Sequence, residues 1–167
     1  MICIVSGTDR PGSNTRKIAE HYHQVLRSLG QHPVFLSLET LQSLKKDDFF
    51  TKMEQEMLVP ATRYIFVVPE YNGSIPGVLK LLIDLSDVKK VWGGGKKALL
   101  TGVATGRAGN LRGMDHLTGI LNHMGVQVLP NKLPISAVNK LLNEQGKLAD
   151  AGTEAVIRQQ VEEFLKF

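Results

Sequence analysis

A stretch near the start of the chain concentrates residues that bind anions. Ser6-Gly7-Thr8-Asp9-Arg10-Pro11-Gly12-Ser13-Asn14-Thr15 combines hydroxyls, an amide, two glycines and an arginine immediately before a helical pattern begins. Backbone N–H groups at a helix N-terminus and the helix dipole attract phosphate, and short side chains donate to its oxygens. The alternative is that one residue simply caps the helix, but a cap needs only one. The available donors are Ser6, Thr8, Arg10, Ser13, Asn14 and Thr15. We interpret the stretch as a phosphate-binding loop.

The spacing within this loop narrows the kind of phosphate. Gly7 and Gly12 have the spacing of a nucleotide-binding P-loop, but Ser13 stands where that motif requires lysine. The dinucleotide fingerprint Gly-x-Gly-x-x-Gly is absent, and no acidic pair of a phospho-acceptor domain follows the first apolar run. The pattern therefore favours a single terminal phosphate over a nucleoside triphosphate or a dinucleotide.

Two further stretches could border a flat ligand. Pro69-Glu70-Tyr71-Asn72-Gly73-Ser74-Ile75-Pro76 restricts its backbone with two prolines and a glycine and offers an aromatic surface at Tyr71. A planar heterocycle and a plain tight turn explain it about equally well. Ala104-Thr105-Gly106-Arg107-Ala108-Gly109-Asn110 allows close backbone approach, and its arginine could stabilise negative charge. By itself this last stretch is a weak signal.

Other familiar chemistries find no support in the sequence. His21 and His23 fall on different helix faces, and His116 and His123 lack a third ligand, so we predict no metal site. No Gly-x-Ser-x-Gly elbow provides a serine nucleophile. Cys3, the single cysteine, lies inside an apolar run and is expected to be a small buried residue without a disulfide.

The elements that position these stretches alternate along the chain. Continuous apolar runs predict strands at residues 2–5, 34–36, 64–68, 98–103 and 126–129. Helical periodicity predicts helices over residues 18–29, 49–57, 76–85, 111–124 and 157–165. Five strands alternating with five helices predict an α/β doubly wound sandwich, formed by residues 1–167 as a single domain. Ligands of such sheets bind at the carboxyl ends of the strands, where the three unusual stretches lie.

Composition limits the class and the partners of the protein. The 167 residues are 43% hydrophobic and 22% charged, with a formal net charge of +4, as in an ordinary globular domain. No apolar run could span a membrane, and the basic residues form no nucleic-acid-binding stripe. The chain starts on a strand-like run without a basic leader, so we expect a cytoplasmic protein.

The first and second stretches together resemble the NADPH-dependent FMN reductase family, which includes flavodoxin-like quinone, azo-dye and chromate reductases. The similarity extends over nearly the whole chain, and Pro-Glu-Tyr-Asn-Gly-Ser is its most specific part. It implies a flavodoxin-like three-layer fold with a five-stranded parallel sheet in the order 2-1-3-4-5. It also implies that FMN is bound between the three stretches. The residues implied to hold the phosphate are Thr8, Arg10, Ser13, Asn14 and Thr15. Those implied to border the isoalloxazine ring are Pro69, Glu70, Tyr71, Asn72, Gly73 and Ser74, with Thr105 and Gly106 at its pyrimidine edge.

The preferred hypothesis is an FMN-dependent NAD(P)H oxidoreductase that reduces a quinone, an azo compound, free flavin or a similar acceptor. The flavin carries the redox chemistry, so no catalytic side chain is required. One alternative is a flavodoxin-like electron carrier that never meets nicotinamide, although such carriers are usually strongly acidic. Another is a flavin-free binding module. The sequence does not choose between NADPH and NADH. The candidate cations for a 2′-phosphate are Arg10, Lys89, Lys90 and Arg107.

The helix after Pro76 indicates self-association. Its apolar residues are Val78, Leu79, Leu81, Leu82, Ile83 and Leu85, which cover most of its circumference. Packing on a sheet needs only one such stripe, so we expect the remainder to contact a second subunit. The resemblance implies the same, and we predict a homodimer or a tetramer.

Overall fold

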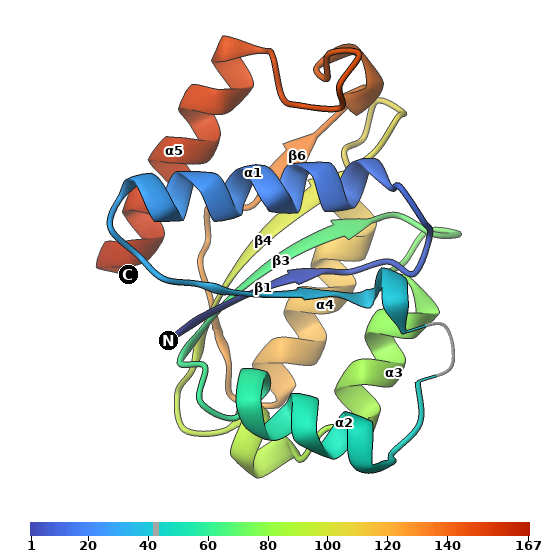
Figure 1. The fold of residues 1–167 in the computed structure, drawn as a ribbon, viewed down its shortest axis with the longest axis vertical. Coiled ribbons are helices and arrows are strands. Elements are labelled where there is room, and N and C mark those ends of the chain that lie inside the picture. Colours follow the sequence, from blue (N-terminus) through green and yellow to red (C-terminus); the bar gives the residue numbers. More distant parts are fainter. Residues whose placement is uncertain (42–43) are drawn as a thin grey trace.

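The computed structural model of the protein describes residues 1–41 and 44–167 and contains one parallel sheet (Figure 1). The strand order is β2-β1-β3-β4-β5, and β6 also pairs with β4. The predicted flavodoxin-like order is therefore confirmed. The strands are β1 (Ile2–Ser6), β2 (Val34–Ser37), β3 (Arg63–Pro69), β4 (Lys97–Val103), β5 (Gln127–Val128) and β6 (Leu133–Ile135).

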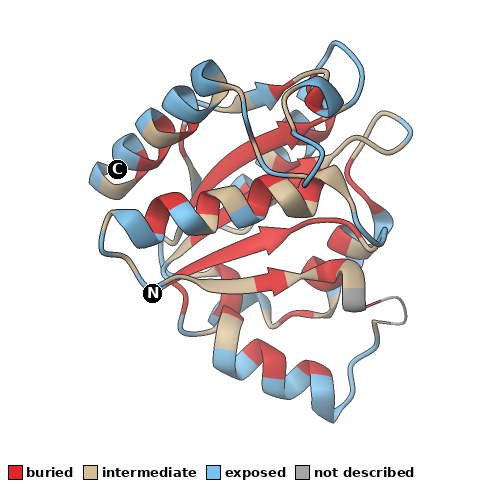
Figure 2. Ribbon diagram, turned by 45° about the horizontal axis from the view of Figure 1, so that its top comes forward, coloured by how far each residue is buried: buried red, intermediate tan, exposed pale blue. Residues whose placement is uncertain are grey.

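Helices cover both faces of the sheet, as the continuous apolar strands require. The helices are α1 (Asn14–Ser28), α2 (Asp48–Met53), α3 (Gly77–Leu85), α4 (Leu111–His123) and α5 (Ala151–Lys166). Ile4, Ile65 and Leu99 belong to the core under α1 and α5, whereas the alternate residues Val5, Phe66 and Leu100 belong to the core under α2, α3 and α4. Figure 2 shows the resulting buried central layer between amphipathic helices.

The helix predicted over residues 49–57 changes its winding part-way. The α-helical turns of α2 end at Met53, and residues 54–58 continue as a π-helical turn. Residues 88–92, between α3 and β4, form a second π-helical turn that the sequence did not predict. It buries Trp92 completely.

The fifth strand differs most from the prediction. Residues 126–129 were expected to form one strand, but two short strands pair with β4, β5 with Lys97–Ala98 and β6 with Thr101–Val103. Pro130 has no N–H to donate to the ladder, and Lys132 N–H donates instead to the carbonyl of Pro130. The chain therefore bulges away from β4 and then rejoins it. This brings residues 135–138 to the carboxyl end of the sheet.

Candidate functional site

A cavity of about 580 Å³ lies at the carboxyl ends of the strands, where the sequence placed the site. Its volume falls within the range of roughly 300–1,000 Å³ that is typical of small-molecule sites. The loops after β1, β3 and β4, which correspond to the three stretches and are named the first, third and fourth loops after those strands, all contribute to its wall. The lining residues are Arg10, Pro11, Gly12, Ser13, Asn14, Thr15, Pro69, Glu70, Tyr71, Val103, Ala104, Thr105, Gly106, Arg107, Ala108, Asn110 and Val138.

One end of the cavity is the N-terminus of α1. Ser13 is the N-cap, and its hydroxyl accepts the N–H of Arg16 at 3.1 Å. The N–H groups of Ser13, Asn14 and Thr15 donate to no protein atom in the described part of the chain. Ser13 therefore does cap the helix, as the alternative interpretation proposed, yet three donors remain available. Free N–H groups at a helix N-terminus suit an anionic group such as a phosphate.

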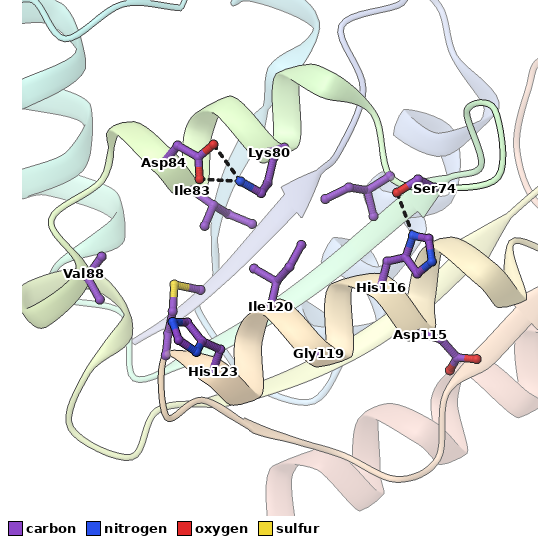
Figure 3. Close-up of a pocket in the computed structure, with 12 residues that line it drawn as sticks. Ser74, Lys80, Ile83, Asp84, Val88, Asp115, His116, Gly119, Ile120 and His123 are labelled. Atoms are coloured by element: carbon purple, nitrogen blue, oxygen red, sulfur yellow. Dashed lines mark hydrogen bonds and ion pairs between the residues drawn. The ribbon is translucent and has the colours of Figure 1, made fainter.

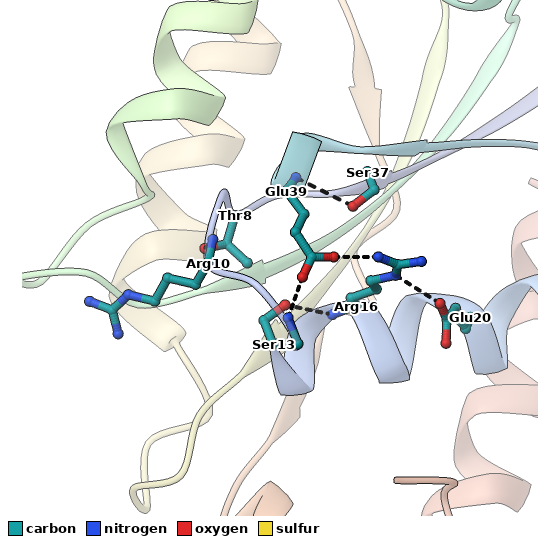
Figure 4. A network of polar contacts seen from close by, with 8 residues as sticks. Thr8, Arg10, Ser13, Arg16, Glu20, Ser37 and Glu39 are labelled. Carbon is teal, nitrogen blue, oxygen red and sulfur yellow. Dashed lines mark hydrogen bonds and ion pairs between the residues drawn. The ribbon is translucent and has the colours of Figure 1, made fainter. Parts of the chain in front are cut away.

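A carboxylate from the short 3-10 turn that follows β2 braces the outer side of this loop (Figure 4). Glu39 accepts a hydrogen bond from the N–H of Gly12 and another from the Arg16 guanidinium at 2.5 Å. Only 10% of the Glu39 side chain is exposed. The hydrogen bond from Arg16 holds the pKa of Glu39 below its usual range. Glu39 and Arg16 therefore hold the loop in place, a role that the sequence did not reveal.

Arg10 belongs to a separate cluster that joins the first and third loops. Its guanidinium carbon lies 4.1 Å from the ring centroid of Tyr71, a cation–π contact. The Tyr71 hydroxyl is 2.5 Å from the hydroxyl of Thr8, which is buried. Figure 4 shows the guanidinium of Arg10 directed away from the Glu39–Arg16 brace. Thr8 thus supports Tyr71 and does not itself line the cavity.

The third loop is a tight hairpin. Tyr71 and Ser74 exchange two backbone hydrogen bonds, at 2.9 and 3.1 Å. Asn72 and Gly73 between them have φ angles of +51° and +80°, as a two-residue type I′ turn requires. The Ser74 hydroxyl lies 2.9 Å from Nδ1 of His116 on α4. Asn72, Gly73 and Ser74 therefore shape the hairpin without lining the cavity, whereas Pro69, Glu70 and Tyr71 do line it.

The fourth loop is held by the segment after β6. Ser136 donates its hydroxyl to the carbonyl of Arg107 at 2.6 Å. The N–H groups of Ala137 and Val138 donate to the carbonyls of Gly106 and Ala104, at 3.0 and 3.1 Å. Residues 136–138 therefore fix the loop that carries Thr105 and Gly106, both of which line the cavity.

Asn110 is a further supporting residue of the site, and it is not among the site residues predicted from the sequence. It is fully buried and has a φ of +66°. Its side-chain amide donates to the carbonyl of Val68 at 2.8 Å, and its side-chain oxygen accepts the N–H of Gly113 at 3.0 Å. It therefore ties the end of β3 to the start of α4. An asparagine immediately before a helical pattern is a recognisable N-cap signal.

Within residues 1–41 and 44–167, no three His, Cys, Asp or Glu side chains gather as a metal-binding group would. No helix in that same part of the chain is both long and apolar enough to cross a membrane.

Comparison with known proteins decides the family. The sequence profile of the NADPH-dependent FMN reductase family matches residues 1–140. The chain belongs to this family. The family resemblance inferred from the first and third loops is thus confirmed.

Two individual relatives match only parts of this chain. An NAD(P)H-dependent FMN reductase of Pseudomonas aeruginosa is 34% identical over 110 residues, which cover 65% of this chain and 60% of that protein. A 2-hydroxy-1,4-benzoquinone reductase of a Burkholderia species is 30% identical over 79 residues, 45% of this chain and 42% of that protein. The matches thus span less than two thirds of either relative.

Solved structures share the fold over almost the whole chain. The flavoenzyme NAD(P)H:(acceptor) oxidoreductase FerB of Paracoccus denitrificans superimposes with a TM-score of 0.80 at 20% identity, covering 99% of this chain and 94% of that one. A flavodoxin of Pseudomonas aeruginosa superimposes with a TM-score of 0.61 at 16% identity, covering 98% and 95%. The fold is therefore flavodoxin-like.

Proposed function

We propose that the protein binds FMN in this cavity and uses NAD(P)H to reduce a quinone-type acceptor. The observation that carries the proposal is the α1 N-terminus, which presents free N–H groups at one end of a cavity closed by two braced loops. Family membership and the reductase names of the relatives support the same activity.

The residues present fit FMN. Ser13, Asn14 and Thr15 would hold its phosphate through their N–H groups and hydroxyl or amide side chains. Pro69, Glu70 and Tyr71 would border the ring, with Thr105 and Gly106 on the facing loop. When bound, FMN supplies the two-electron chemistry, taking hydride from NAD(P)H and passing electrons to the acceptor. The chain itself binds and orients the reactants.

No protein thiol competes with that chemistry. Cys3 is completely buried in β1, and burial raises the pKa of its thiol to about 12. A thiol held protonated and away from solvent is unreactive. A lone inert cysteine suits the cytoplasmic location that we propose for the protein.

Mixing the purified protein with FMN, NADPH and menadione tests the proposal. We expect tight flavin binding and continuous NADPH oxidation that depends on the quinone. An electron carrier would bind FMN yet oxidise NADPH only slowly, and a flavin-free module would show no flavin spectrum. Either of those outcomes would overturn the proposed activity.

We also propose that the protein is a homodimer or a tetramer, assembled through the groove between α3 and α4 (Figure 3). The groove measures about 930 Å³ and includes Ile83, Val88 and Ile120 in its wall. Leu79, Leu82 and Ile83 of α3 are buried in the core, whereas Leu81 is 39% exposed and nearby Val88 is 51% exposed. Apolar surface beyond the core-facing stripe supports contact with a second copy.

Light scattering at micromolar concentration tests this assembly. We expect the mass of a dimer or a multiple of it for the native chain. The Val88→Asp variant should shift the mass toward the monomer, because Val88 lines the groove and the change places a charge within the contact. The control is Lys52→Asp on α2, outside the groove. A monomeric native protein would contradict the proposal.

A further inference from the structure

The wall of the proposed flavin cavity carries an excess of positive charge. Arg10, Glu70 and Arg107 are its charged lining residues, two cations against one carboxylate. The Arg10 guanidinium already lies against the ring of Tyr71. No aromatic ring of the described residues lies against the guanidinium of Arg107 in this way.

The Arg107 side chain is free to meet a ligand. It is exposed, and its guanidinium makes no ion pair or hydrogen bond with any residue in the described ranges 1–41 and 44–167. By contrast, the backbone of Arg107 is held firmly, because its carbonyl accepts the Ser136 hydroxyl and the neighbouring Gly106 carbonyl accepts the N–H of Ala137. A fixed backbone thus presents an exposed, unpaired cation at the cavity wall.

The backbone around Arg107 is also receptive to negative charge. The N–H groups of residues 105–109 have no hydrogen-bond acceptor among the described residues, and residues 105–108 are exposed. Consecutive free N–H groups beside a guanidinium form an environment that favours anions. The backbone of this loop and the Arg107 guanidinium therefore both suit a ligand with a negative group.

The other cations considered from the sequence do not lie at this wall. Lys89 and Lys90 belong to the turn at residues 88–92, which contributes nothing to the cavity lining, and Lys90 lies 3.6 Å from Asp87. Of these four cations, only Arg107 lines the cavity with a side chain that makes no hydrogen bond, ion pair or cation–π contact among the described residues.

We infer that Arg107 is a specificity-determining residue that selects acceptors carrying an ionised group, such as hydroxyquinones, over uncharged quinones. The inference rests on the proposed function, because the acceptor must enter the cavity that holds the flavin. Arg107 directly follows Thr105 and Gly106 and lines the same cavity, so an acceptor bound there would meet its guanidinium. A guanidinium binds such an oxygen with a charge-assisted hydrogen bond.

The overall reaction balances without a further reactant. NAD(P)H gives up a hydride, which contains both electrons and one proton, and becomes NAD(P)⁺. The quinone accepts those two electrons, that proton and one more proton from water, and becomes the hydroquinone. Arg107 takes no part in the bond changes; it orients the acceptor and offsets its charge.

The test compares two naphthoquinones of similar shape. Lawsone carries a hydroxyl that is ionised at neutral pH, whereas menadione carries an uncharged methyl group. Equilibrium binding of each to the oxidised holoprotein is followed by difference absorbance, and kcat/KM is measured with NADPH. The proteins are the native chain, Arg107→Gln, Arg107→Lys and Lys89→Gln, the last being a control that removes one charge away from the cavity.

We expect Arg107→Gln to weaken lawsone binding about fivefold to tenfold, with menadione changed less than about twofold, since one partly screened charge pair is lost. Arg107→Lys should restore part of the preference, and Lys89→Gln should leave both quinones unchanged. Equal losses for both quinones, or an effect confined to NADPH, would overturn the inference.

Failure of the proposed function would be distinguishable from failure of the role assigned to Arg107. A native protein that binds no FMN or oxidises no NADPH would overturn both statements. A native protein that turns over both quinones, with Arg107→Gln behaving like Lys89→Gln, would overturn only the assignment of Arg107. Flavin content is measured for every variant so that loss of FMN is not counted as loss of acceptor binding.

Discussion

Replacing Arg10 with alanine separates two contacts that this side chain can make. The sequence placed Arg10 at the FMN phosphate, and the structure places its guanidinium 4.1 Å from the ring centroid of Tyr71. Both positions lie along the cavity, since Arg10 and Tyr71 line it together. Riboflavin has the same ring as FMN but no phosphate, and therefore reports only on the contact with Tyr71.

The two contacts differ in strength. An exposed cation–π contact contributes about 0.5–1 kcal/mol, or about twofold to fivefold in affinity. A charge-assisted hydrogen bond to a phosphate contributes about 1.5–3 kcal/mol, or about 10-fold to 150-fold. We expect Arg10→Ala to weaken FMN binding by at least about tenfold and riboflavin binding by no more than about fivefold.

Titration calorimetry of both ligands into both proteins at one salt concentration measures the difference. Arg10→Lys is the matched variant, because it keeps the charge for the phosphate but loses the flat guanidinium that covers Tyr71. It should recover part of the FMN affinity. Equal losses of FMN and riboflavin in Arg10→Ala would refute the phosphate contact and leave Arg10 as a support for Tyr71 alone.

Three other substitutions test the supports of the site. Tyr71→Phe removes the hydroxyl that lies against Thr8. It should weaken FMN binding about twofold to tenfold in a fluorescence titration, which is the contribution of one net hydrogen bond. An unchanged affinity would mean that this hydrogen bond does not position the hairpin. Gly109→Ala should lower the free energy of unfolding in urea by about 2–4 kcal/mol, because φ is +58° and the new Cβ would lie 2.6 Å from a proline side chain. The control, Gly77→Ala in open space at the start of α3, should be neutral or stabilising. The pKa of Glu39 is lowered in the folded protein, so its contribution to stability is present at neutral pH and is lost as the pH falls through that lowered value. Glu39→Gln should therefore lose less stability in acid than the native chain. Identical curves of stability against pH for the two proteins would contradict the bracing role of Glu39.

The sheet was predictable because its strands are continuous apolar runs that need cover on both faces. Ile4, Ile65 and Leu99 show the pattern directly, since each is fully buried in the layer under α1 and α5. Helix ends were also readable, as at Gly30, which follows α1 with a φ of +74°. The split of the fifth strand was not predicted, although Pro130 is visible in the sequence, because its effect depends on which neighbour the strand pairs with.

The candidate site was predictable where its residues are close together in the sequence, and less so where segments far apart in the sequence meet. The first loop is adjacent to its helix, so Ser13 and Thr15 could be placed at a helix N-terminus from their order alone. The brace by Glu39 and the hydrogen bonds from residues 136–138 join segments that are far apart in sequence. The hydrophobic periodicity of the sequence does not indicate such contacts. Arg10 illustrates the limit, since its position in the loop was evident but its contact with Tyr71 was not.

A crystal structure of the protein grown with FMN tests the central claim most directly. We expect the phosphate to accept the N–H groups of Ser13, Asn14 and Thr15, with the ring between Pro69–Tyr71 and the loop at residues 104–108. Flavin bound elsewhere, or a cavity that stays empty at FMN concentrations that saturate the protein in solution, would contradict the account.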